Sequence, residues 1–321
     1  MHVTTYTPEL RRMLTEGTGQ LAHPLRLRLT DRLLATQASD GGFPGRLGSS
    51  DLYYAGFAAR SAGLLEIEKS SFWEGLWTFL YRGDHVIADV AQAVSALLVR
   101  SELDRAGRKA CCPDSEKRFI DGTLSVVERF RHPDGGYAKR IGGPVSTYHT
   151  FLAALCFESA GRPLSEPDRI GELVLRHRGR EGGFSDVVSD EVEGTNATAA
   201  AVSLLELLDA LDGQVARDAR DFLIRQQRDD GGFAASPGTP AADLMSTFTA
   251  LLTLVRLDAK QTVRMGAVGR YVKKLALPEG GFAGAVGDRT GDIEYLYYGL
   301  GTLALLARHV ARAKPVQERI P

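Results

Sequence analysis

A short acidic segment near the C-terminus is the place in this 321-residue sequence where side-chain types and spacing best suggest chemistry. Asp292 and Glu294 are separated by one residue and followed by Tyr295, directly ahead of an apolar run that begins at Leu296. A carboxylic acid held in an apolar cavity beside another carboxylate has a raised pKa and can act as a general acid. The simpler alternative is that each acid only caps a helix.

The same arrangement recurs along the chain, at the start of each of six apolar segments. Aligning these segments places a short polar residue or glycine at the first position of each: Asp51, Asp89, Ser146, Gly194, Asp243 and Asp292. Side-chain oxygens at this position accept hydrogen bonds from the free N–H groups of a helix start, so capping explains most of them. The next residues of the frame are less ordinary, because several are aromatic or ionisable.

These segments belong to a repeat. Paired glycines followed by Phe or Tyr begin at residues 41, 135, 182, 231 and 280, at intervals of 94, 47, 49 and 49 residues. Since 94 is twice 47, a degenerate copy is expected between the first two, with its turn near Gly83. Six copies at this period indicate a repeat architecture. We interpret each glycine pair as a left-handed helix C-cap and each following aromatic residue as packing between repeats.

Each repeat is predicted to be a helical hairpin. The segment before the glycines carries charge on one face, whereas the segment after them is apolar nearly all round, which is typical of a half-exposed helix beside a buried one. Two concentric rings satisfy both, so the fold class is all-α, an (α/α)6 toroid. The outer helices are expected at residues 31–37, 71–81, 115–131, 167–177, 215–228 and 262–275. Residues 1–30 are predicted to lead into a single toroid domain at 31–310, with a tail at 311–321.

A closed ring would bring six helix N-termini to one end, which we call the mouth. Aligned peptide dipoles give that end a positive field that favours phosphate or diphosphate. Aromatic residues just inside the caps would wall a cavity suited to a long hydrocarbon and to a carbocation. The residues predicted to bind substrate there are Tyr53, Tyr54, Tyr148, His149, Phe248, Tyr295, Tyr298 and Arg289. The alternative is that the aromatic residues only pack the core.

The pattern resembles the terpenoid cyclase and protein prenyltransferase superfamily, whose toroids carry Gln-x-x-Asp/Glu-Gly-Gly-Phe turns. Segments 37–43 and 227–233 match that turn, and the resemblance extends over roughly residues 31–307. It implies an isoprenoid-handling enzyme similar to the β subunit of protein prenyltransferases, acting on a prenyl diphosphate or polyprenoid. A helical partner subunit is one option that the resemblance implies.

The resemblance also implies a zinc site, which this sequence lacks in part. Members of this type bind zinc through an Asp-x-Cys segment and a His; here Asp243 is present, but Met245 and Tyr295 stand at the other two positions. A thioether and a phenol are poor zinc ligands, so no metal or other cofactor is predicted. The family's basic diphosphate clamp is also missing, and the substitutes near the mouth are Arg46, Lys139, Arg140 and Arg289.

Class II terpene cyclases carry Asp-x-Asp-Asp in the same frame and protonate an alkene with the middle Asp. By this resemblance Glu294 takes the position of the proton donor, with Asp292 as its neighbour and Asp243 as the corresponding acid of the fifth repeat. Otherwise Glu294 is expected to pair with a loop arginine such as Arg289. Three hypotheses remain open: a prenyltransferase-like enzyme without zinc, a small acid-initiated cyclase, and a toroid that binds lipid or protein without catalysis.

Composition excludes other classes. With 39 basic and 40 acidic residues the net charge is −1, which gives no electrostatic basis for binding nucleic acid. No apolar run reaches the roughly 18 residues of a membrane-spanning helix, and the start lacks the pattern of a secretory signal. The expected location is cytoplasmic.

Overall fold

The computed structural model describes residues 5–110, 112–189, 192–259 and 261–313, and within them the regular secondary structure is helical apart from two very short strands. Six helices form an inner ring: α3 (Leu52–Leu65), α5 (Val90–Arg105), α7 (Thr147–Ala160), α9 (Thr195–Leu207), α11 (Leu244–Arg256) and α13 (Ile293–Ala313). Six others form an outer ring: α2 (His23–Thr36), α4 (Ser70–Arg82), α6 (Pro113–Glu128), α8 (Pro167–Leu175), α10 (Gly213–Arg225) and α12 (Met265–Leu275). The strands are β1 (Phe233–Ala234) and β2 (Ala242–Asp243), which pair antiparallel.

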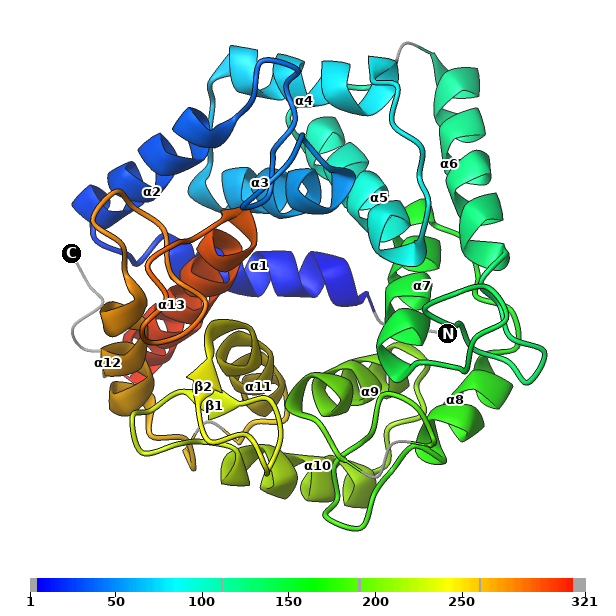
Figure 1. Ribbon diagram of the computed structural model, residues 1–321, viewed down its shortest axis with the longest axis vertical. Coiled ribbons are helices and arrows are strands. Elements are labelled where there is room, and N and C mark those ends of the chain that lie inside the picture. The colour runs from blue at the N-terminus through cyan, green and yellow to red at the C-terminus, as the bar shows by residue number, and fades with distance from the viewer. Residues whose placement is uncertain (1–4, 111, 190–191, 260, 314–321) are drawn as a thin grey trace.

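Each inner helix contacts the next along the chain, and α13 contacts α3, so the inner ring closes (Figure 1). The inner helices are buried on most sides, whereas outer helices such as α10 bury one face only. The prediction of an all-α toroid with inner and outer rings is therefore confirmed. The first outer helix differs from expectation, because it begins at His23 instead of Asp31, with Pro24 in the first turn where a missing N–H costs nothing.

Helix α1 (Tyr6–Thr18) belongs to neither ring. It lies across one end of the inner ring, packed against α13, α3 and α7 (Figure 1). Its contact with α13 is close at Gly17, where an added Cβ would stand 2.0 Å from the carbonyl oxygen of Ala304. Only glycine allows the two helix backbones to approach this closely. The cavity inside the ring is therefore covered at this end by a helix from outside the repeats.

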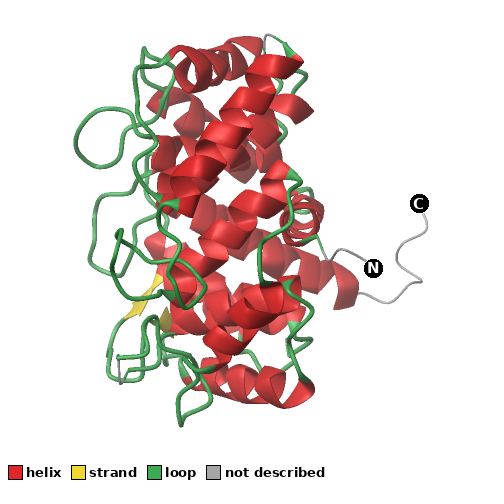
Figure 2. Cartoon of the chain, turned by 90° about the vertical axis from the view of Figure 1, so that its right-hand side faces the viewer, coloured by secondary structure: helices red, strands yellow, loops and turns green. Residues whose placement is uncertain are grey.

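The paired glycines are not helix C-caps, and this part of the prediction is wrong. Helix α2 ends at Thr36 and its C-cap, Gln37, has an extended backbone; the glycine pair follows in a separate tight turn. Gly41 has φ +84°, and the turn is closed by hydrogen bonds between Ala38 and Gly42 and from Gly41 to Ala38. The prediction of a left-handed backbone at the glycine pair is confirmed at Gly41, but this conformation forms a small hairpin beyond the helix instead of the helix end. These hairpins and loops gather on one face, which is the mouth (Figure 2).

The aromatic residue after each glycine pair is buried, with an exposed fraction of 2% or less at Phe43, Tyr137, Phe184, Phe233 and Phe282. The expected hidden copy exists as the hairpin of α4 and α5, but Gly83 has φ −72° and starts an extended connection instead of a left-handed turn. Among the described residues, no helix is long and apolar enough to cross a membrane.

Candidate functional site

All six inner helices begin at the mouth, and five of them are capped there by the side chain that the repeat frame identified. The carboxylates of Asp51, Asp89 and Asp243 and the hydroxyl of Ser146 accept backbone N–H groups of the first turn. Asp292 accepts the N–H of Tyr295 at 3.1 Å. Gly194, at the sixth start, has no side chain that could cap. Helix capping therefore accounts for four aspartates at the mouth, and Glu294 is the acid that it leaves over.

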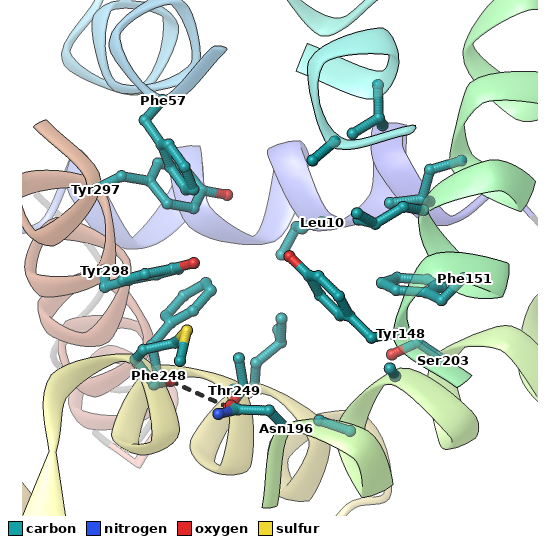
Figure 3. A pocket seen from close by; sticks show the side chains of 18 of the residues that line it. Leu10, Phe57, Tyr148, Phe151, Asn196, Ser203, Phe248, Thr249, Tyr297 and Tyr298 are labelled. Carbon is teal, nitrogen blue, oxygen red and sulfur yellow. Dashed lines mark hydrogen bonds between the residues drawn. The ribbon is translucent and has the colours of Figure 1, made fainter. Parts of the chain in front are cut away.

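A cavity lies inside the ring, between the mouth and α1 (Figure 3). Its volume of about 150 Å³ is far larger than the voids that native cores leave by imperfect packing. The wall is mainly apolar and aromatic, and α1 contributes Tyr6 and Leu10 to it. Of the residues predicted to bind substrate, Tyr53, Tyr148, Phe248 and Tyr298 line this cavity. Figure 3 shows the Tyr148 side chain directed into its middle from α7.

The aromatic side chains of the wall contact one another as a continuous cluster. Ring centroids are 5.0 Å apart for Tyr53 and Phe57, 5.4 Å for Phe57 and Tyr298, and 5.5 Å for Phe248 and Tyr298. Burial raises the pKa of Tyr53 and of Tyr298 well above the usual value for a phenol. The phenols are therefore neutral at physiological pH, and the ring faces present negative charge density to whatever occupies the cavity.

Glu294 lies at the mouth end of this aromatic cluster, in the first turn of α13. Its Oε1 accepts a 2.7 Å hydrogen bond from the hydroxyl of Tyr53 on α3, so the first and last inner helices meet through this pair. Burial raises the pKa of Glu294, and the neighbouring Asp292 carboxylate raises it further, while the bond from Tyr53 acts in the opposite direction. The expected pairing with Arg289 is wrong, because Arg289 is exposed and the partner of Glu294 is a phenol.

Beside Glu294, on the outside of the mouth, a second depression lies between the starts of α3 and α13, the end of β2 and the loops that precede α3 and α13. We call it the hollow; it is lined by Arg46, Leu47, Tyr54, Asp243, Gly284, Ala285, Asp288, Asp292, Glu294 and Tyr295. Glu294 therefore borders the hollow on one side and bonds a cavity-lining residue on the other. Tyr54 and Tyr295, predicted with the cavity group, lie in the hollow instead.

Arg46 is the central cation of the hollow. It contacts Asp288 at 2.7 Å and Asp292 at 3.2 Å, and its guanidinium carbon lies 5.4 Å from the centre of the Tyr295 ring. The N–H of Thr290 and the Arg46 guanidinium together hold the pKa of Asp288 down to about 2. Arg46, which the sequence offered as a substitute diphosphate clamp, thus already has two carboxylate partners. The other candidates for that role, Lys139 and Arg140, are exposed on a loop.

The positions where the family resemblance implies zinc ligands do not fit that metal. Asp243 uses one oxygen to accept the Ser246 N–H and the other to accept the Ser246 hydroxyl, each at 2.7 Å. Met245 lines the cavity, whereas Tyr295 lines the hollow. A capped carboxylate, a thioether and a phenol that face different spaces do not form a zinc donor set. Within the described residues, no group of three His, Cys, Asp or Glu side chains could hold a metal.

His149 is placed away from both spaces. Its Nδ1 lies 2.9 Å from the Ser146 hydroxyl, which in turn donates to Asp186, and burial lowers the pKa of the imidazole. The residue lines neither the cavity nor the hollow. Its contacts indicate that it orders the start of α7, so the structure does not bring it together with the other predicted substrate-binding residues.

Two features of the site were missed by sequence reasoning. Arg60, on the third turn of α3, lines the cavity, and so does Asn196, whose Oδ1 accepts the Thr249 hydroxyl at 2.6 Å (Figure 3). Arg60 could have been found, because it is the single charged residue in the apolar run 52–65.

Exposed aliphatic residues occur in five of the six loops that surround the mouth. They are Leu47, Val86, Ile141, Val188, Val192 and Val286, each with more than half of its surface exposed. Single exposed apolar residues are ordinary, but their recurrence around one opening gives the rim an apolar character.

The sequence matches the model of one protein family, described as the prenyltransferase alpha-alpha toroid domain, over residues 11–215 and 198–318. The chain belongs to this family. It is 26% identical over 195 residues to the protein farnesyltransferase subunit beta of Pisum sativum, covering 59% of this chain and 45% of that protein. It is 30% identical over 228 residues to the geranylgeranyl transferase type-2 subunit beta of Candida albicans, covering 67% and 64%. The chain thus spans less than two thirds of these curated relatives.

Solved structures share the fold at low sequence identity. One chain of the Candida albicans protein geranylgeranyltransferase-I complexed with GGPP matches with a TM-score of 0.65 at 14% identity, covering 88% of this chain and 90% of that one. A variant of a type II terpene cyclase from Scytonema, in complex with geranylgeranyl dihydroxybenzoate, matches with a TM-score of 0.61 at 14% identity, covering 95% and 99%. A glycosidase in complex with glucose matches with a TM-score of 0.56 at 14% identity, covering 95% and 99%. The fold therefore serves unrelated chemistries, and the residues of the site decide which one a given protein performs.

Proposed function

We propose that this protein is an isoprenoid-handling enzyme whose reaction begins when Glu294 protonates a carbon–carbon double bond of a ligand in the central cavity. The observation that carries the proposal is the Glu294 carboxyl, which is partly buried beside the hollow, has a raised pKa and accepts the hydroxyl of Tyr53, a residue of the aromatic cavity wall. An acid with these surroundings remains partly protonated nearer to neutral pH, as a general acid must.

The chemical nature of the cavity supports an isoprenoid as the ligand. Its wall is mainly hydrocarbon and its rim is apolar, so the cavity is suited to an apolar group more than to a sugar. Two structurally similar proteins carry isoprenoids by the names of their complexes, one GGPP and the other geranylgeranyl dihydroxybenzoate. The described residues of the cavity wall include no carboxylate, which argues against a sugar bound there between the paired acids that glycosidases use.

In the proposed reaction the proton moves from the Glu294 carboxyl to one alkene carbon, and the π electrons form the new C–H bond. The neighbouring carbon becomes a cation, which the ring faces of Phe57, Phe248 and Tyr298 stabilise by cation–π attraction. Attack by a second double bond closes a ring and leaves a cation on another carbon. A carbon next to that cation then gives a proton to water, so the product is an isomer of the substrate. The Tyr53 hydroxyl stabilises the carboxylate that Glu294 leaves behind.

We propose that this reaction requires no zinc. The three residues at the family's ligand positions offer one capped carboxylate, one thioether and one phenol. They lie in two different spaces, and Asp243 has both oxygens engaged.

A second candidate is transfer of a prenyl group from a diphosphate, favoured by the similarity to transferase β subunits. That chemistry would call for a helical partner subunit and for cations at the mouth. It fits the site less well, because Arg46 is already bound by Asp288 and Asp292. A lipid-binding toroid without chemistry is the third reading, in which Glu294 serves only to hold α13 against α3.

Native mass spectrometry of the protein purified from cells, with metal analysis of the same sample, separates these readings. A retained polyprenoid and less than stoichiometric zinc support the proposal. Stoichiometric zinc would contradict the metal-free mechanism, a retained prenyl diphosphate with a copurified helical subunit would favour the transferase, and an empty protein would favour a role without catalysis.

A further inference from the structure

Arg60 is a cation inside the cavity that has no carboxylate partner among the described residues. It lies nine residues beyond the cap of α3, about 13 Å along the helix axis from the mouth. Among the cavity-lining residues of the described chain, Arg60 is the only charged one. No acid of the described chain lies within ion-pair distance of its guanidinium. A guanidinium that remains charged in an apolar space is costly unless something compensates it.

Three other arginines near the end of the ring that α1 covers each bind a carboxylate, and in this respect Arg60 differs from them. Arg11 and Arg105 both bind Glu102, at 3.1 and 3.0 Å, and Arg256 binds Glu206 at 2.9 Å. The charge of Arg60 reaches Glu102, but two other arginines already contact that carboxylate. The group of Arg11, Arg60, Arg105 and Glu102 therefore keeps a net positive charge.

The contacts that Arg60 does make leave donors free. Its guanidinium carbon lies 4.2 Å from the centre of the Tyr297 ring and 4.5 Å from that of Phe57, and its Nε donates to the carbonyl oxygen of Gly56 at 3.1 Å. Its side chain also bonds that of Tyr297. A guanidinium has five N–H donors. In the described structure, each Arg60 nitrogen either has a hydrogen-bond partner or is accessible, because none is buried without a partner. The remaining donors are therefore open to the cavity.

The proposed chemistry makes an uncompensated Arg60 a disadvantage. A fixed positive charge repels the carbocation that protonation by Glu294 would create in the same cavity. The two ring faces stabilise the guanidinium but do not cancel its field, which reaches Glu294. A negative charge supplied by the ligand would remove this conflict.

We propose that the ligand of this cavity is an isoprenoid carboxylic acid, whose carboxylate pairs with Arg60 while its double bond faces Glu294. A single guanidinium matches one carboxylate in charge and in the geometry of a paired hydrogen bond. A diphosphate would bring several negative charges to a wall with one cation. Neutralising Arg60 would also remove one of the influences that lower the pKa of Glu294, after the hydrogen bonds from Tyr53 and Tyr298, so binding would favour the protonated acid. This inference rests on the proposed function and assigns its substrate class.

The test compares farnesoic acid, its methyl ester, farnesol and farnesyl diphosphate as ligands of the full chain, by quenching of tyrosine and tryptophan fluorescence. The variants are Arg60→Gln, Arg60→Lys, and Arg180→Gln as a control that removes an exposed charge from a loop of the mouth. Circular dichroism and thermal melting establish that each variant is folded.

We expect the acid to bind the wild-type protein and Arg180→Gln about tenfold more tightly than the ester, as one charged hydrogen-bonded pair allows. Arg60→Gln should lose this preference with little change in ester affinity, and Arg60→Lys should retain part of it. Equal binding of acid and ester, or a preference for the acid that survives in Arg60→Gln, would overturn the inference. Binding of the ester and of farnesol would in that case still support the apolar cavity. A larger Arg60-dependent gain for the diphosphate would overturn the carboxylate assignment. Failure of all four compounds to bind would contradict the proposed function as well.

Discussion

The hydroxyl of Tyr53 donates a 2.7 Å hydrogen bond to Oε1 of Glu294, and this bond joins the first inner helix to the last. The two residues are 241 positions apart in the sequence and meet only because the ring closes. Tyr53 lines the cavity and Glu294 borders the hollow, so the bond lies at the boundary between the two spaces.

Replacing Glu294 by Gln should abolish most turnover and leave the fold intact. Glutamine keeps an oxygen that can accept the Tyr53 hydroxyl but has no proton of suitable acidity to give. We expect turnover of a polyprenoid substrate to fall roughly 10²- to 10⁴-fold, as loss of a general acid usually causes. Asp89→Asn is the matched control, because it alters a cap on α5 instead of the acid. A Glu294→Gln variant with wild-type turnover would exclude Glu294 as the proton donor.

Replacing Tyr53 by Phe should move the pH dependence of turnover. Glu294 must be protonated to act, so turnover falls as the pH rises through its pKa. The Tyr53 hydrogen bond lowers that pKa, and its removal should shift the falling limb of the kcat profile to higher pH. Tyr54→Phe, which removes a hydroxyl from the hollow, should leave the limb in place. A shift to lower pH in Tyr53→Phe would contradict the assignment.

Stability should report the same group without any substrate. The pKa of Glu294 is raised in the folded protein above its usual value of 4.5, so the folded state holds this proton more tightly than the unfolded state. This stabilisation is complete below pH 4.5 and is lost as the pH rises through the folded-state pKa. Urea unfolding of the wild type and Glu294→Gln over a pH series isolates it. The wild type should lose stability relative to the variant across that window, and a difference that does not change with pH would argue against a raised pKa.

Asp243 should behave as a helix cap and not as a catalytic group. Its two oxygens accept the N–H and the hydroxyl of Ser246, so Asp243→Ala should reduce the free energy of unfolding by about 1 kcal/mol. Turnover measured on the folded fraction should stay near the wild-type value. A loss of turnover as large as that of Glu294→Gln would return Asp243 to the catalytic group in which the sequence placed it.

The contact between α1 and α13 can be tested with one methyl group. Gly17→Ala would place a Cβ 2.0 Å from the carbonyl oxygen of Ala304, and the backbones would have to separate. We expect a loss of about 1–3 kcal/mol, the usual cost of overpacking, measured by thermal or urea unfolding. Gly19→Ala is the matched control, since its Cβ meets nothing closer than 3.6 Å. Equal stability of the two variants would mean that α1 is not held tightly against the ring.

The sequence predicted the fold well because the toroid is encoded by local patterns that repeat. Apolar segments, acidic caps and glycine turns recur at nearly constant intervals, and the helices follow from them with small errors at their ends. The glycines were misassigned because a left-handed residue in a hairpin and one at a helix end have the same sequence signal. The start of α2 was missed because its first turn has no side-chain cap.

The site was predicted less completely, since ring closure decides which caps and aromatic residues meet. The frame identified Tyr53 and Glu294 separately, but their hydrogen bond depends on α13 returning to α3. For the same reason, the partner of Asp292 proved to be Arg46, 246 positions away. Tyr54 and Tyr295 differ from their neighbours only by one position in the helix, which turns them toward the hollow.

The most direct test is to incubate the protein with geranylgeraniol, geranylgeranyl diphosphate or geranylgeranoic acid in deuterated buffer and analyse the products by mass spectrometry. Protonation of a double bond by Glu294 places one solvent-derived hydrogen on carbon, so the wild type should convert a substrate into an isomer that carries one deuterium. Glu294→Gln should form little or none of it. Conversion without deuterium on carbon, or equal labelling by Glu294→Gln, would contradict acid initiation by Glu294.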